Sequence, residues 1–242
     1  MNNTVHKAHT YRLVSAIIDS PVISNDVYFK GGTCAMMLGF LDRFSVDLDY
    51  DLKKEADNKG IDRELRKIFK KFDFELVKKS HNSLFYVLRY KSELGERSNL
   101  KLSIVDKSFQ ANIYLPQYLK EIDRFCVCQT KETMFANKLV AITDRYKKRK
   151  DIAGRDIYDI HHFFMRGFNY TSDVISERTK KVPMMYFKEL VNFIETKVTD
   201  TILTQDLSFL LHPSQFKKLI KILKNETIMF LNQEIEKLSI NK

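Results

Sequence analysis

The sequence predicts an α+β fold, in which a mixed β-sheet with packed helices is followed by a helical region. Apolar and polar residues alternate as in strands before residue 130, whereas nearly everything after Thr130 has helical periodicity. The chain has 242 residues, 44% of them hydrophobic, and only 7 glycines and 4 prolines, so it can bury a sizeable core. We therefore expect two domains, at residues 1–130 and 131–242.

Local patterns place the elements of the first domain. Residues 5–19 put Tyr11, Val14 and Ile18 on one side of a helix, and Pro21 closes the segment. The strand and turn VYFKGG precede TCAMMLGFL, a short helix that Thr33 is expected to cap. The predicted helices are 5–19, 33–41 and 62–72, and the predicted strands are 27–30, 45–52, 74–80, 83–92, 99–106 and 124–129.

The strand at 45–52 has two chemically different faces. Its apolar face holds Val46, Leu48, Tyr50 and Leu52, and its acidic face holds Asp47, Asp49 and Asp51. Carboxylates at i and i+2 on a strand point to the same side and supply the hard oxygen ligands that suit Mg²⁺. An acidic strand face of this kind is most often only solvated, so the pattern alone is a weak signal for a metal site.

The turn at Gly31 and Gly32 lets the backbone approach a phosphate closely, and a helix that begins near Thr33 offers unpaired N–H groups. Such a turn is also more often structural than functional. Joined to Asp47 and Asp49, however, it predicts a site that holds a nucleoside triphosphate and its metal ion, as in a nucleotidyltransferase.

Charge and cysteine content restrict the partners and the compartment. Forty-one Lys and Arg against 31 Asp and Glu give a net charge of +10, which favours polyanions such as RNA or DNA without establishing one. Cys34, Cys126 and Cys128 do not form a disulfide framework or a zinc knuckle, so we expect free thiols. Because no apolar run approaches a signal peptide or a membrane span, we expect a soluble, cytoplasmic protein without membrane contact.

The second domain is predicted from three apolar stripes and one basic run. The stripes are Phe135, Leu139, Ile142 and Tyr146; then Ile157, Ile160 and Phe164; then Leu219, Ile222 and Leu223. The basic run RYKKRK at 145–150 is either a solvated loop or a contact to the phosphate backbone of an RNA acceptor.

The stretch KGGTCAMMLGFLDRFSVDLDYDL resembles the strongest motif of the AbiEii/AbiGii toxin family, in the DNA polymerase β-like nucleotidyltransferase superfamily. That motif runs Lys-Gly-Gly-Thr-Ala, an apolar helix, then Arg-Phe-Ser-x-Asp-Leu-Asp. The matching residues are Lys30, Gly31, Gly32, Thr33, Arg43, Phe44, Ser45, Asp47, Leu48 and Asp49. The resemblance implies a nucleotidyltransferase-type fold in which Lys30, Gly31, Gly32, Thr33 and Ser45 bind the nucleotide and Asp47 and Asp49 bind Mg²⁺ or Mn²⁺.

A second block, KLVAITDRYKKRKDIAGRDIYDIHHFF, resembles the later motifs of this family: a helical lysine, an arginine two turns on, and an Arg-Asp-x-x-Asp helix. It implies that Lys138 and Asp156 are catalytic, that Arg145 binds the nucleotide, and that the helical domain completes the active-site cleft. From spacing alone, a salt bridge between Arg155 and Asp159 would be the favoured interpretation of the last motif.

The chain departs from the family pattern at a third acidic position, which the resemblance places on a neighbouring strand as Lys-x-Asp or Lys-x-Glu. In LKLSIVD, Lys101 matches but Ser103 stands in the place of the acid. Alternation turns Asp106 to the opposite face unless a bulge intervenes, and Asp51 lies ~6.6 Å along the strand beyond Asp49. The replacement of this acid by Ser103 bears on catalysis more than on nucleotide binding.

By resemblance, the sequence predicts a toxin-like, Mg²⁺-dependent transferase that moves a nucleotide from an NTP to an RNA, with tRNA favoured, and releases pyrophosphate. The family also implies an antitoxin partner and a role in bacterial abortive infection. One alternative is a catalytically lapsed protein that binds nucleotide and RNA or an antitoxin, which Ser103 favours. Another is transfer to a protein hydroxyl group.

Overall fold

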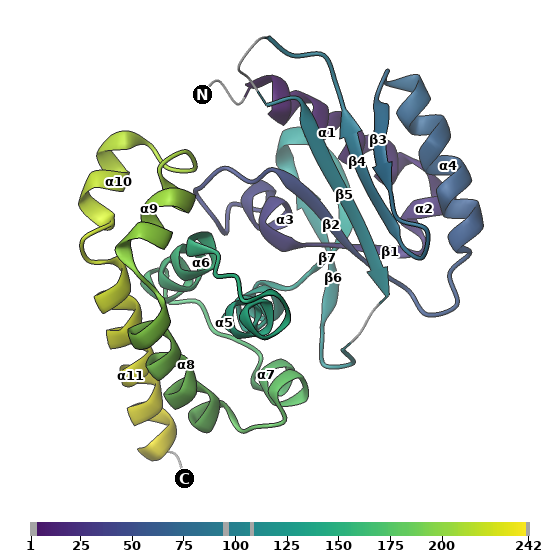
Figure 1. Cartoon of the computed structure of the whole chain (residues 1–242). Helices are drawn as coiled ribbons and strands as arrows, with labels where there is room; N and C mark the ends of the chain where they lie inside the picture. Colours follow the sequence, from purple (N-terminus) through teal and green to yellow (C-terminus); the bar gives the residue numbers. More distant parts are fainter. Residues whose placement is uncertain (1–3, 94–96, 107–108, 241–242) are drawn as a thin grey trace. The chain divides into compact units, whose positions relative to one another are not determined.

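The computed structural model describes residues 4–93, 97–106 and 109–240, which form two compact units (Figure 1). The first unit comprises Met1–Ser108 and Tyr114–Gln129, and the second comprises Phe109–Ile113 and Thr130–Lys242. The first unit holds a mixed sheet with helices and the second is helical, so the predicted α+β class is confirmed.

The first unit is built on a seven-stranded sheet with the order β3-β4-β5-β2-β1-β7-β6. Its strands are β1 (Val27–Lys30), β2 (Asp47–Leu52), β3 (Glu75–Lys79), β4 (Leu84–Arg89), β5 (Asn99–Asp106), β6 (Tyr114–Leu119) and β7 (Arg124–Gln129). The central strand β2 runs antiparallel to β1 and parallel to β5, and β1 runs parallel to β7. The sheet is therefore mixed, as predicted.

The helices of this unit are α1 (Thr4–Asp19), α2 (Pro21–Ser24), α3 (Gly31–Met37) and α4 (Asn58–Lys71). Phe69 of α4 packs edge-on against Tyr86 of β4, with ring centroids 5.2 Å apart. Tyr86 pairs with Leu102, which in turn pairs with Leu48 of β2, so α4 covers the apolar face of the sheet. Asp47 and Asp49, one residue away from Leu48, lie on the opposite face.

Several details of the first unit differ from the sequence-based expectations; the helix predicted at 33–41, for example, is α3 at Gly31–Met37. The edge strand β6 was not predicted because Pro116 interrupts its pattern, and an edge is where a sheet tolerates a missing N–H group. Pro21 begins the short helix α2 rather than only ending α1. The helix α4 begins at Asn58, four residues earlier than predicted, because the carboxylate of Asp57 accepts hydrogen bonds from the N–H groups of Lys59 and Gly60.

In the described residues, the regular elements of the second unit are helices, and the segment Phe109–Ile113 is a non-helical part of this unit. The helices are α5 (Lys131–Arg149), α6 (Gly154–Met165), α7 (Ser172–Thr179), α8 (Pro183–Lys197), α9 (Asp200–Leu207), α10 (Pro213–Leu219) and α11 (Leu223–Ile240). The third predicted stripe is divided, because Leu219 ends α10 and Leu223 begins α11. Within the part of the chain that the structure describes, none of the helices has the length and apolar character needed to span a membrane.

His6 connects α1 to the residue that precedes β2. Its Nε2 lies 3.0 Å from the carbonyl oxygen of Val46, its Nδ1 lies 2.6 Å from the hydroxyl of Tyr90, and the side chain is 2% exposed. Burial lowers the pKa of His6 to about 4, although the carbonyl of Val46 acts in the opposite direction. The neutral imidazole is therefore the form that the fold accommodates.

We expect His6 to make the protein less stable in mild acid. The pKa of His6 is lower in the folded state than in the unfolded state, so the unfolded chain binds more protons between pH 6.5 and about 4. The contribution of His6 to the free energy of unfolding is therefore fully present above pH 6.5 and falls as the pH drops. The loss between pH 7 and pH 5 should be about 2 kcal/mol. Urea denaturation of the wild type and of His6→Gln at both pH values measures it. The exposed His212 gives a control, since His212→Gln should keep the wild-type difference.

Candidate nucleotide and metal site

The first turn of α3, which follows β1 directly, is packed against the acidic strand. Gly31 has φ +80°, and a Cβ atom there would lie 2.8 Å from Oδ2 of Asp49. A Cβ atom at Gly32 would lie 2.8 Å from Oγ of Ser45. Both glycines therefore allow the first turn of α3 to approach β2 more closely than other residues would.

Thr33 has a different local role from the predicted one. The helix α3 begins at Gly31 with Lys30 as its N-cap residue, so Thr33 lies inside the first turn and does not cap it. The buried hydroxyl of Thr33 donates a hydrogen bond to the carbonyl oxygen of Asp47 and lies 3.0 Å from Oγ of Ser45. Thr33 and Ser45 thus fix the beginning of β2 against α3, while the backbone N–H groups of the turn remain the candidate phosphate donors.

Asp47 and Asp49 lie on the same face of β2, and both side chains are partly accessible to solvent. Within the described residues, no group of three or more His, Cys, Asp or Glu side chains is arranged to hold a metal ion. Two carboxylates still fit Mg²⁺, because this ion commonly takes one or two carboxylates and completes its shell with water and substrate phosphates.

The neighbouring strand β5 does not supply a third acid to this face. Asp47 pairs with Lys101 and Asp49 pairs with Ser103 in a regular parallel register, so Ser103 lies where an acid would face Asp49. The register continues without a bulge to Leu52 and Asp106, which places Asp106 on the apolar side of the sheet.

Asp51 is committed to a buried hydrogen-bond network. Its carboxylate accepts hydrogen bonds from Nζ of Lys30 at 2.5 Å, from the hydroxyl of Tyr114 at 2.7 Å and from Nε2 of Gln129 at 2.9 Å. Asp51 is only 3% exposed. These contacts indicate that Asp51 holds the ammonium group of Lys30 beside the first turn of α3 and does not act as a metal ligand. The spacing of residues along the sequence does not predict these contacts.

In the helical unit, α5 and α6 bring four predicted charged residues together. Nζ of Lys138 lies 2.8 Å from Asp159 and 3.2 Å from Asp156, and Arg145 contacts the other oxygen of Asp156 at 3.3 Å. Both aspartates are fully buried, whereas Lys138 and Arg145 are partly exposed. The ion-pair partner that the structure gives to Asp159 is therefore Lys138, and spacing alone had favoured Arg155.

Sequence patterns did not identify Arg178 of α7 as important. Its side chain binds two residues of α5, one before and one after Lys138. Its guanidinium donates to Oδ1 of Asn137 at 2.6 Å and to Asp144 at 2.7 Å. Its neighbour Glu177 accepts the N–H groups of Gln110 and Ala111 at 2.9 and 2.8 Å, which ties the segment Phe109–Ile113 to this unit. The separations of 34 to 67 residues leave no local pattern from which these contacts could be predicted.

Replacing Gly31 by alanine should impair the site beyond its cost in stability. Gly31→Ala should cost about 1 kcal/mol for the positive φ angle and should also displace the carboxylate of Asp49. Gly39→Ala is a matched control, because Gly39 has φ +72° with no atom within 4 Å of a built Cβ. We expect similar thermal stabilities for both variants but weaker nucleotide binding for Gly31→Ala alone. Equal binding would show that the contact with Asp49 is irrelevant to the nucleotide.

Comparison with solved structures identifies similar folds at low sequence identity. The crystal structure of JHP933 from Helicobacter pylori matches with a TM-score of 0.58 and 19% identity over 98% of this chain and 94% of that one. A further Helicobacter pylori structure, of a protein assigned as a nucleotidyltransferase, matches with a TM-score of 0.62 and 17% identity over 100% and 99% of the two chains. MenT4, a nucleotidyltransferase toxin from Mycobacterium tuberculosis, matches with a TM-score of 0.52 and 15% identity over 94% and 83%.

Sequence comparison is more specific than these fold similarities. Among curated proteins, none is a significant sequence match to this chain. A family model described as the nucleotidyl transferase AbiEii toxin of type IV toxin–antitoxin systems matches residues 12–220, which includes the glycine turn, β2 and the charged residues of α5 and α6. The chain therefore belongs to the AbiEii family of nucleotidyltransferase toxins.

Proposed function

We propose that this nucleotidyltransferase uses Mg²⁺ to move a nucleotide from an NTP to an RNA acceptor, with tRNA as the favoured acceptor, and releases pyrophosphate. The observation that carries the proposal is the Gly31 turn, which abuts the carboxylate of Asp49 at the accessible face of β2. This turn offers backbone N–H groups to phosphates beside two carboxylates that suit a divalent ion.

In the first unit, each candidate residue has a definite part in this proposal. The N–H groups of Gly32 and Thr33 bind phosphate oxygens, Lys30 adds a positive charge held by Asp51, and Ser45 keeps the turn in register with β2. Asp47 and Asp49 would hold the Mg²⁺ ion, with Mn²⁺ as the alternative. When bound, the ion neutralises negative charge on the phosphate oxygens.

For the charged cluster of the second unit, we propose the roles that the resemblance to the family motifs implies. Lys138 and Arg145 would balance the charge that develops on the leaving pyrophosphate. Both oxygens of Asp156 are engaged in ion pairs in a buried position, which supports a positioning role for this residue rather than proton transfer. Asp159 would position Lys138 in the same way.

The reaction itself requires one bond to form and one to break. The acceptor hydroxyl oxygen attacks the α-phosphorus while the bond from that phosphorus to the bridging oxygen of the β-phosphate breaks, so pyrophosphate leaves with that electron pair. With serine at position 103, we propose that the hydroxyl proton passes to water rather than to a carboxylate on β5.

Two further features support RNA as the acceptor and a protein as a partner. The end of α5 exposes a run of cations, Lys147, Lys148, Arg149 and Lys150, close in the helix to Arg145. A phosphate backbone is the ligand that such a run favours. Membership of a toxin–antitoxin family also implies an antitoxin, and we propose that such a protein controls this enzyme.

The test is incubation with each α-³²P-labelled NTP, Mg²⁺ and total bacterial RNA and protein, with NTP binding measured in parallel. We expect label in RNA, above all in the tRNA fraction, and loss of label when EDTA is added. Label confined to protein would replace RNA by a protein hydroxyl group. Binding without labelled product would establish the catalytically lapsed alternative, which Ser103 favours.

A further inference from the structure

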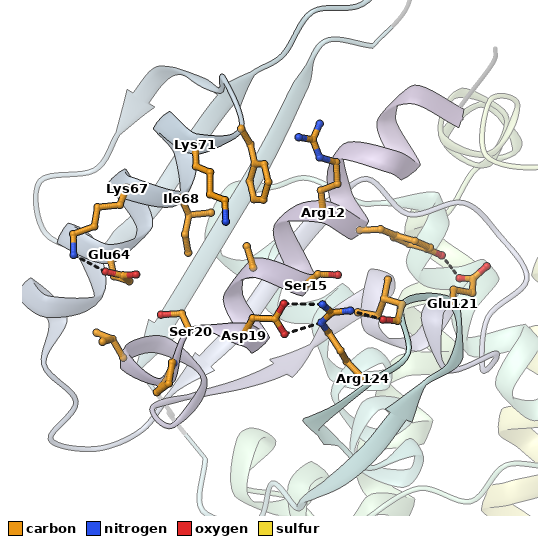
Figure 2. A pocket seen from close by; sticks show the side chains of 16 residues that line it. Arg12, Ser15, Asp19, Ser20, Glu64, Lys67, Ile68, Lys71, Glu121 and Arg124 are labelled. Carbon is orange, nitrogen blue, oxygen red and sulfur yellow. Dashed lines mark hydrogen bonds and ion pairs between the residues drawn. The ribbon is translucent and has the colours of Figure 1, made fainter.

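A groove of about 680 Å³ runs between α1 and α4 in the first unit (Figure 2). Its lining includes the apolar residues Ala16, Ile68 and Ile122, together with charged side chains from α1, α4 and β7 and that of Glu121. Because α4 packs on the face of the sheet that holds Leu48, the groove lies on the side opposite Asp47 and Asp49.

The negative charges in this groove are already neutralised. Asp19 forms a two-pronged ion pair with the guanidinium of Arg124, with both contacts at 2.7 Å. Glu64 pairs with Lys67 at 2.9 Å, and Glu121 pairs with Lys7 at 2.7 Å (the hydroxyl of Tyr11 also donates to Glu121). The three carboxylates that line the groove therefore leave little negative potential to repel an anion.

Two positive charges in the groove, those of Arg12 and Lys71, lie against an aromatic ring. Hydrogen bonds from Arg124 lower the pKa of the Asp19 carboxyl, and the charge of Lys71 also helps to lower it. The guanidinium carbon of Arg12 lies 4.7 Å, and Nζ of Lys71 lies 5.7 Å, from the centre of the Phe72 ring. Neither Arg12 nor Lys71 forms an ion pair with a carboxylate in the described part of the chain. Figure 2 shows Arg12 on α1 and Lys71 on α4 at opposite sides of the groove. A ring does not cancel a charge, and the carboxylate of Asp19 near Lys71 is already engaged by Arg124, so both cations can still contact an anion.

The outer face of α4 extends this positive charge along the groove. The helix has six basic residues against two acidic ones, a net charge of +4 in 14 residues. The basic residues are Lys59, Arg63, Arg66, Lys67, Lys70 and Lys71, and all six are exposed. Arg63, Lys67 and Lys71 recur every four residues, about 6 Å apart along the helix axis, although Lys67 is also paired with Glu64. A regular row of cations suits a polyanion with regularly repeating charges.

We propose that the groove between α1 and α4 binds the phosphate backbone of RNA, on the face of the sheet opposite Asp47 and Asp49. Phosphates contact Arg12 and Lys71, the row on α4 follows the strand, and the Phe72 ring and the apolar residues of the lining accept ribose and base surfaces. The choice of RNA over other polyanions rests on the proposed function. Because the groove lies on the other face of the sheet, it should contribute to affinity for RNA and not for the NTP.

The test compares Arg12→Ala/Lys71→Ala with Lys54→Ala/Lys78→Ala, a control that removes two exposed lysines elsewhere in the first unit. Binding of fluorescein-labelled bulk bacterial tRNA is followed by anisotropy from 50 to 200 mM KCl, without NTP. We expect the groove variant to bind about tenfold more weakly and to lower the slope of log K against log salt by about 2, while the control keeps the wild-type slope. Both variants should bind ATP with Mg²⁺ as the wild type does.

Several outcomes would overturn the proposal. The first is an unchanged tRNA affinity in the groove variant. The second is a loss of tRNA affinity in the control variant as large as that in the groove variant. The third is a loss of ATP affinity in the groove variant as large as its loss of tRNA affinity, which would make the groove a nucleotide site. If polyglutamate displaced the labelled tRNA as strongly as unlabelled tRNA does at equal charge, the groove would be assigned to an acidic protein. Parallel labelling assays keep the two proposals separate: absence of transfer by the wild type rejects the proposed function, and groove-dependent tRNA binding is measured independently of it.

Discussion

The double variant Asp47→Asn/Asp49→Asn should lose Mg²⁺-dependent transfer of α-labelled nucleotide by at least ~10³-fold, equivalent to about 4 kcal/mol of transition-state stabilisation. Asparagine keeps the shape of both side chains but removes the charges that would hold the ion. The backbone pairing of β2 with β1 and β5, which orders this strand, does not depend on those charges. The fold should therefore remain intact, and thermal denaturation of the variant checks this.

Asp106→Asn provides the matched control on the neighbouring strand. Asp106 pairs with Leu52, so its side chain leaves β5 on the apolar side of the sheet. We expect wild-type labelling from this variant. Undiminished labelling by the Asp47/Asp49 variant would reject the proposed metal site, and a strong loss in Asp106→Asn would mean that the acid on β5 takes part after all.

Local patterns were sufficient for the elements that frame this site. The alternation around Leu48 and Tyr50 predicts β2 and its two faces, because this signal lies within a few consecutive residues. The glycine pair predicts a change of direction after β1, but both glycines belong to the first turn of α3 rather than to a turn before it. The edge strand β6 escaped prediction, since Pro116 is a signal against strands that only its place at the edge overrides.

Contacts between distant residues decide what local patterns leave open. Alternation places Asp51 with Asp47 and Asp49, yet only the fold brings Tyr114 and Gln129 to it from 63 and 78 residues away. The partners of Lys138 likewise come from another helix, 18 residues further along the chain in the case of Asp156. The sequence thus identifies which side chains could bind a metal ion or a phosphate. Tertiary contacts determine which of them are instead paired with other side chains of the protein.

Lys138→Met should both destabilise the helical unit and strongly reduce labelling. Its ammonium group is 2.8 Å from Asp159, whose side chain is completely buried, so its removal leaves a buried carboxylate without that cation. Breaking a buried pair in this way costs about 3–5 kcal/mol. If Lys138 also neutralises charge on the triphosphate, its loss should lower transfer by about 10²–10³-fold. Urea denaturation and the labelling assay measure the two effects separately.

The double variant Lys138→Met/Asp159→Asn separates structure from catalysis. It removes the negative charge of Asp159 together with the positive charge of Lys138, so most of the lost stability should return, whereas the positive charge does not. Asp159→Asn alone keeps Lys138 beside Asp156, and it should retain measurable transfer. If the stabilised double variant recovered its labelling activity, Lys138 would be a structural residue. Continued absence of labelling in a well-folded protein is the result expected of a lysine that acts on the nucleotide itself.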